Sequence, residues 1–149
     1  MRSVKRCGQP PPAPQPSRDT AQVPARFPAV PAEVVTAALG RVRAASDPDP
    51  ADLRLLTKQF LGELCRRAPG RSVEVRIPPY AVAQCIAGAR HTRGTPPAVV
   101  ETDPLSWVLL ACGDLAWEEA LRTGAVVASG ERSDLSGLLP LTDQGDRPE

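Results

Sequence analysis

The stretch that decides the fold covers residues 102–130 and reads TDPLSWVLLACGDLAWEEALRTGAVVASG. Its first part predicts a short helix, because Asp103 can cap a helix whose first residue is Pro104. Gly113 is expected to end this helix in the left-handed conformation, which glycine adopts without a Cβ penalty. Apolar residues crowd both sides of the expected helix, which indicates that it is buried: Leu105, Trp107, Val108, Leu109 and Leu110.

The second part of the same stretch predicts a further helix and a strand. Asp114 is expected to cap this helix, and Gly124 is expected to end it. Residues 125–129 then form a short strand. The helix has one buried face, because its apolar residues recur at intervals of three and four: Leu115, Trp117, Ala120 and Leu121.

Two more helices are expected upstream of this stretch. Residues 31–45 place an apolar stripe on one side of a helix that Pro31 can open. A longer helix over residues 50–67 follows, with Asp49 as its cap and Pro50 as its first residue. Its buried stripe consists of Leu53, Leu56, Phe60 and Leu64, widened by Leu55 and Leu61.

Strands and a closing helix complete the predicted domain. Residues 72–77 alternate between apolar and polar side chains, as in a half-buried strand. Residues 80–87 form a second strand, in which Val82 and Ile86 lie opposite a face of small side chains. The remaining elements are a third strand over residues 98–102 and a closing helix over residues 131–139, with Leu135, Leu138 and Leu139 facing inward.

The length and the proline content divide the chain. With 149 residues it has room for one domain plus extensions. Its 18 prolines fall heavily before residue 32, so residues 1–30 are expected to be a disordered tail. The domain then covers residues 31–141, and residues 142–149 form a second disordered tail. Neither a secretory signal nor a run long enough to span a membrane is recognisable, which predicts a cytoplasmic location.

Charge and the chemistry-bearing residues exclude several classes of function. Acidic residues outnumber basic ones in residues 71–141, which argues against nucleic-acid binding. His91 is the only histidine, so a metal site built from several histidines is excluded. The four cysteines have neither CxxC spacing nor the density of a disulfide scaffold, and no nucleophile-elbow motif is present. The prediction is a protein that is not an enzyme and that holds no metal or cofactor.

A resemblance to a known family accounts for these patterns. The order of helix, glycine, helix, glycine and strand in residues 102–130 resembles the C-terminal half of the sterol carrier protein (type 2) family. RSVEVRIPPYAVAQC at residues 71–85, HTRGTPPAVVETDPLSW at 91–107 and SGERSDLSGLLPL at 129–141 are similar to a compact bacterial branch of that family. The likeness covers roughly residues 52–141. It implies an α/β (α+β) fold in which a mostly antiparallel sheet of four or five strands is covered on one face by helices.

The resemblance also implies non-enzymatic binding or carriage of an apolar ligand, such as a lipid, an acyl chain or a sterol-like molecule, in a cavity between sheet and helices. Arg90, His91 and Arg93 either gather an anionic head group or form a solvated loop. The alternative is an accessory module without a cavity, which docks a protein partner through this loop or through the proline-rich tail. The expected lining of the cavity is Leu56, Phe60, Leu64, Val82, Ile86, Val100, Trp107, Leu110, Leu121 and Leu138.

Overall fold

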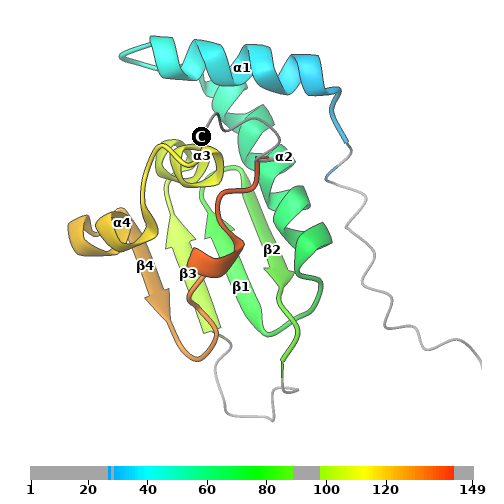
Figure 1. Ribbon diagram of the computed structural model, residues 1–149, viewed down its shortest axis with the longest axis vertical. Helices are drawn as coiled ribbons and strands as arrows, with labels where there is room; N and C mark the ends of the chain where they lie inside the picture. Colours follow the sequence, from blue (N-terminus) through cyan, green and yellow to red (C-terminus); the bar gives the residue numbers. More distant parts are fainter. Residues whose placement is uncertain (1–26, 28, 89–97, 143–149) are drawn as a thin grey trace, which may run out of the picture.

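Helices gather on one side of a four-stranded sheet in the computed structural model, which describes residues 27, 29–88 and 98–142 (Figure 1). This is the α+β arrangement that the resemblance implies, so the predicted fold class is confirmed. The strands are β1 (Val73–Ile77), β2 (Ala81–Cys85), β3 (Ala98–Thr102) and β4 (Val126–Ser129). The helices are α1 (Ala32–Ala44), α2 (Pro50–Arg67), α3 (Pro104–Cys112) and α4 (Trp117–Thr123), followed by a 3₁₀ turn, η1 (Ser136–Leu138).

The sheet is mixed and has the strand order β2-β1-β3-β4. β1 pairs with β2, and β3 with β4, in antiparallel fashion, whereas the central pair of β1 and β3 is parallel. In this register Val75 lies opposite Ala83 on β2 and opposite Val100 on β3. All three side chains are buried, so they form one continuous row across the covered face of the sheet.

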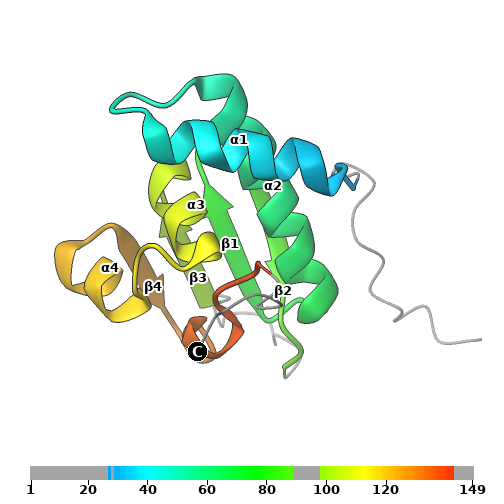
Figure 2. The same ribbon diagram turned by 45° about the horizontal axis from the view of Figure 1, so that its top comes forward.

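The small side chains of β2 lie on the covered face. Ala83 and Cys85 are buried, while Val82 and Gln84 between them are exposed, as the alternation of a strand requires. The short side chains let α2 pack closely over β2, where the Cys65 thiol donates to the Gln84 carbonyl oxygen at 3.7 Å. Figure 2 shows α1, α2 and α3 in front of the strands, so one face of the sheet is covered by helices.

The helix caps predicted at Asp49 and Asp103 are confirmed. The Asp49 carboxylate accepts a hydrogen bond from the Ala51 N–H at 2.8 Å at the start of α2. The Asp103 carboxylate accepts one from the Ser106 N–H at 3.0 Å at the start of α3. Gly113 ends α3 with φ at 86°, in the left-handed region that favours glycine. These local signals therefore set both ends of the buried helix that carries Trp107.

The cap predicted at Asp114 is wrong. α4 begins at Trp117 after Ala116, and no side chain caps it. The Asp114 carboxylate instead accepts two hydrogen bonds from the Arg43 guanidinium of α1, at 2.7 and 3.0 Å. A bidentate, charge-assisted pair is stronger than a single bond to a backbone N–H, and it lowers the pKa of the Asp114 carboxyl. Asp114 therefore ties α1 to the α3–α4 connection.

The closing helix expected over residues 131–139 is also wrong, since only the short turn η1 forms there. The Ser133 hydroxyl donates to the Gly130 carbonyl at 2.8 Å, and the Asp134 carboxylate accepts from the Ser136 N–H at 2.9 Å. Short polar side chains that bond to nearby backbone in this way compete with helix formation. Leu135 is nevertheless fully buried, as expected, while Leu138 and Leu139 are half-buried.

The segment before α1 packs on α2. Phe27, which falls within the expected tail, is buried, and a Cβ added to Gly62 would lie 3.0 Å from the Phe27 Cβ. The Val30 N–H also donates to the Gln59 side chain at 3.2 Å. Phe27 therefore belongs to the hydrophobic core. Residues 1–26, 28 and 143–149 of the expected tails lie outside the described residues.

Candidate functional site

Most of the predicted lining residues meet in one place, between α2, α3 and the covered face of the sheet. Six of them are at most 4% exposed and belong to a single core cluster. The Trp107 indole N–H from α3 donates to the Thr57 carbonyl oxygen of α2 at 3.3 Å, which joins the two helices above the sheet. The six are Leu56, Phe60, Leu64, Val100, Trp107 and Leu110.

The other predicted residues lie elsewhere. Ile86 and Leu138 are half-buried at the border of the core. Val82 is 43% exposed on the uncovered face of β2, and Leu121 is 42% exposed on α4. The structure does not bring Val82 and Leu121 together with the central six. Arg90, His91 and Arg93 lie outside the described residues.

Thr57 is a residue of this interior that sequence reasoning missed. It is fully buried, and its hydroxyl is the one buried side-chain polar atom without a hydrogen-bond partner among the described residues. It shares the buried face of α2 with Leu64, seven residues or about two helical turns later. The detectable signal was a polar residue placed four after Leu53 and four before Leu61, within the apolar stripe.

Among the described residues, two further polar side chains are buried, and each makes a hydrogen bond. The Thr102 hydroxyl donates to the Ala125 carbonyl oxygen at 2.8 Å. The Ser72 hydroxyl donates to the Ile86 carbonyl oxygen at 2.6 Å. The Thr57 hydroxyl differs from the Thr102 and Ser72 hydroxyls and is unusual, because buried polar groups nearly always have a hydrogen-bond partner.

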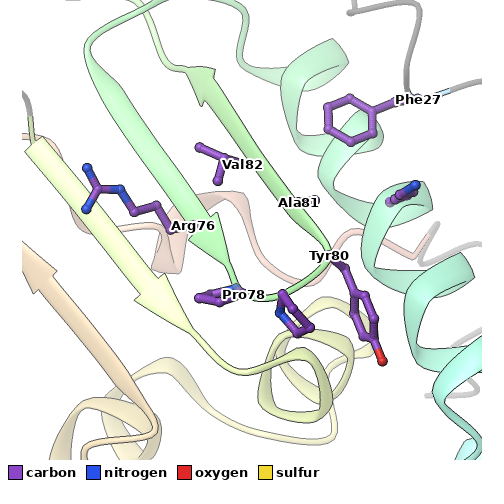
Figure 3. A pocket seen from close by; sticks show the side chains of 8 residues that line it. Phe27, Arg76, Pro78, Tyr80, Ala81 and Val82 are labelled. Carbon is purple, nitrogen blue, oxygen red and sulfur yellow. The ribbon is translucent and has the colours of Figure 1, made fainter.

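A surface hollow of about 420 Å³ opens at the turn between β1 and β2 (Figure 3). Figure 3 shows Arg76 and Val82 on the uncovered side of this hairpin, with Phe27 beside α2 beyond the edge of β2. The Tyr80 N–H donates to the Ile77 carbonyl at 2.9 Å, which closes the turn. The lining consists of Phe27, Lys58, Arg76, Pro78, Pro79, Tyr80, Ala81 and Val82.

The comparison with protein families decides the relationship. Residues 49–141 match the model of the family described as bacterial SCP ortholog. The chain belongs to this family. The matched segment begins at the cap of α2 and ends at Leu141, so α1 and Phe27 lie outside the matched residues. No curated protein matches the sequence significantly.

The thiols of this SCP-family chain are placed for packing. Cys65 and Cys85 are buried between α2 and β2, and Cys112 is half-buried at the end of α3. Burial raises the pKa of the Cys85 thiol to about 12, and it also raises the pKa of the Cys112 thiol. A thiol is a nucleophile only as the thiolate, so neither pKa suits covalent chemistry at neutral pH.

A second hollow of about 450 Å³ lies at the α1–α2 turn and is lined by Arg41, Ala44, Ala45, Asp47, Asp49 and Asp52. The Asp52 carboxylate there accepts two hydrogen bonds from Arg41, at 2.8 and 2.9 Å, and these bonds lower the pKa of the Asp52 carboxyl. Within residues 27, 29–88 and 98–142, no three potential ligands from His, Cys, Asp and Glu cluster as a metal site would require. The described helices also include none that is long and apolar enough to cross a bilayer.

Proposed function

We propose that this chain binds an apolar ligand that carries one polar group, in the space between α2, α3 and the sheet, without a chemical step. The ligand class is a lipid, such as a long-chain alcohol, a fatty acid or a sterol-like molecule. Membership of the bacterial SCP family supports a carrier role. The observation that carries the proposal is the unpaired Thr57 hydroxyl in the middle of an otherwise apolar interior.

The cost of an unpaired hydroxyl favours a bound ligand as its hydrogen-bond partner. Leaving a buried hydroxyl unpaired costs about 1–3 kcal/mol, a cost that an apolar side chain at this position would avoid. A ligand with a hydroxyl, ester or carboxylic acid group would supply the missing hydrogen bond. The surrounding side chains, Leu56, Phe60, Leu64 and Trp107, would contact its apolar body.

A binding series with two variants of Thr57 tests the proposal. Trp107 reports on the same space, because its indole N–H is bonded to the Thr57 carbonyl, so its emission should change when a long-chain alcohol enters. Thr57→Val removes the hydroxyl at nearly constant volume and should weaken binding about tenfold. Thr57→Ser keeps the hydroxyl and is the matched control, which should bind as the native chain does. Equal affinities of the native chain and Thr57→Val would refute the role of the hydroxyl.

The second candidate is the packed accessory module, which one observation favours. The six central side chains already fill the interior among themselves, each being at most 4% exposed. The loop and tail through which such a module would dock lie outside the described residues.

Leu110→Trp separates the two candidates. In a solid core the added volume costs about 1–3 kcal/mol of unfolding free energy. In a carrier the new ring would occupy ligand space, so lipid affinity would fall while stability changed little. Native mass spectrometry of the purified chain adds an independent readout, because a carrier should retain lipid. Lost stability together with no lipid binding in either protein would leave the accessory module.

A further inference from the structure

The hollow beside the β1–β2 turn has a chemistry that the proposed lipid site does not use. Its lining includes two cationic side chains, Lys58 and Arg76, and no carboxylate. Apolar walls complete it, chiefly Phe27, Ala81 and the 43% exposed Val82. The volume of about 420 Å³ lies within the range of about 300–1,000 Å³ that is usual for small-molecule sites.

Lys58 is the residue that makes this hollow more than a surface feature. It is half-buried, and its ammonium has no hydrogen-bond or ion-pair partner in the described part of the chain. A partly buried charge is costly unless it is paired. Six described arginines, by contrast, do reach a carboxylate: Arg41, Arg43, Arg66, Arg67, Arg76 and Arg122.

The arrangement around Lys58 defines the ligand. Arg76 is engaged with Glu74, so it adds little net charge to the hollow. One unpaired ammonium beside apolar walls therefore matches a molecule with a single negative charge and a compact apolar body. Arg54, one helical turn earlier on α2, is also without a described partner, but it is exposed and does not line the hollow.

We propose that this hollow is a second binding site, separate from the helix–sheet interior, for a small organic carboxylate with an apolar body. Lys58 pairs with the carboxylate, and the apolar body lies against Phe27, Ala81 and Val82. Because Phe27 precedes the matched residues 49–141, one wall of the site comes from outside the segment that matches the family.

Two aromatic reporters allow a direct test in the full chain. Tyr80 is the only tyrosine, and it lines the hollow, whereas the Trp107 indole lies in the helix–sheet interior. An NMR titration with octanoate should give saturable shifts of the Tyr80 ring signals. Octanamide, of the same size but uncharged, should bind about tenfold more weakly.

Three variants of α2 complete the experiment: two each remove one positive charge, and the third keeps it. Lys58→Gln should weaken octanoate binding about tenfold at the Tyr80 signals, abolish its salt dependence and leave octanamide unaffected. Arg54→Gln is the matched control on the same helix and should bind octanoate as the native chain does. Lys58→Arg should retain binding because the charge is kept.

Three outcomes would overturn the proposal. The first is equal octanoate affinity in the native chain and Lys58→Gln, and the second is an equal loss in Arg54→Gln, which would indicate general charge attraction. The third is a shift confined to the Trp107 indole signal. That result would place the carboxylate in the interior, so the second site would fail while the proposed lipid site stood.

Discussion

Two buried threonines, Thr57 on α2 and Thr102 at the end of β3, have the same side chain in opposite circumstances. Thr102 is 4% exposed, and its hydroxyl donates to the Ala125 carbonyl at 2.8 Å. Thr57 is fully buried, and its hydroxyl has no partner among the described residues. The chain itself supplies a hydrogen-bond acceptor for the Thr102 hydroxyl and supplies none, within the described residues, for the Thr57 hydroxyl.

The difference follows from the elements on which the two residues lie. Thr102 ends an edge pairing with β4, where the carbonyl of Ala125 just before that strand is free to accept. Thr57 lies inside a helix, where a threonine hydroxyl can donate to the carbonyl four residues earlier, as Thr123 donates to Glu119 at 3.0 Å, but the Thr57 hydroxyl makes no such bond. The carbonyl of Thr57 also accepts from Trp107. A polar side chain at the centre of a helix face therefore depends on whatever packs against that face.

The largest effect is expected from Leu64→Ala, two helical turns after Thr57. Removing a fully buried leucine side chain should lower the free energy of unfolding by about 2–5 kcal/mol. Chemical denaturation measures this loss. Leu121→Ala is the matched control, because Leu121 is 42% exposed and the same truncation should change stability by less than about 1 kcal/mol.

Adding a lipid to the Leu64→Ala variant tests whether the region around Thr57 accepts a ligand. If the region of Thr57 receives a lipid, a long-chain alcohol should raise the melting temperature of Leu64→Ala more than that of the native chain, because it fills the new space. No rise in either protein would argue that this region is closed to ligands.

The next-largest effect is expected at the Gly124 turn, beside the hydrogen bond between Thr102 and Ala125. Gly124 precedes Ala125 with φ at 78°, and this left-handed turn brings the Ala125 carbonyl to Thr102. A Cβ at Gly124 would meet nothing within 4 Å, so Gly124→Val should cost about 1–3 kcal/mol through backbone strain alone. Gly113→Val, with φ at 86° and Pro140 3.5 Å away, is the companion variant and should cost at least as much. Unchanged denaturation midpoints in both would show that these turns do not require glycine.

Local signals explain how much of this fold could be predicted. Asp103, Pro104 and Gly113 define α3 through contacts within a few residues, so the sequence alone contains the information. The features that escaped prediction depend on distant partners. Asp114 bonds to Arg43, 71 residues earlier, and Phe27 rests on Gly62, whose missing side chain makes the space.

Only the residues at the centre of the candidate site could be predicted from the sequence. Residues on the apolar stripe of α2 and in α3 had to be buried somewhere, and they meet above the sheet. Strand alternation places Val82 opposite the small residues, but it does not say which face the helices cover. The helices cover the small face, because Ala83 and Cys85 allow the closer approach of α2. Thr57 escaped because a hydroxyl without a partner is a property of the packed structure.

Thr102→Val tests the satisfied hydroxyl and should have a moderate effect. Valine fits the volume of threonine but cannot donate, so the Ala125 carbonyl would lose its hydrogen bond inside the protein. We expect a loss of about 1–2 kcal/mol in the free energy of unfolding, measured by denaturation in urea. A double variant with Gly124→Val should lose less than the sum of the two single losses, because both changes break the same contact. Full additivity would mean that the turn and the hydrogen bond act independently.

Thr57→Val is expected to have the smallest effect and the opposite sign. Replacing a buried hydroxyl that has no partner by a methyl group of similar size removes a desolvation cost and breaks no hydrogen bond. In lipid-free protein the free energy of unfolding should therefore rise by about 1 kcal/mol, whereas Thr102→Val lowers it. A loss in Thr57→Val as large as that in Thr102→Val would mean that the Thr57 hydroxyl is already paired. The contrast between the two threonines would then disappear, and with it the principal argument for a polar lipid group at α2.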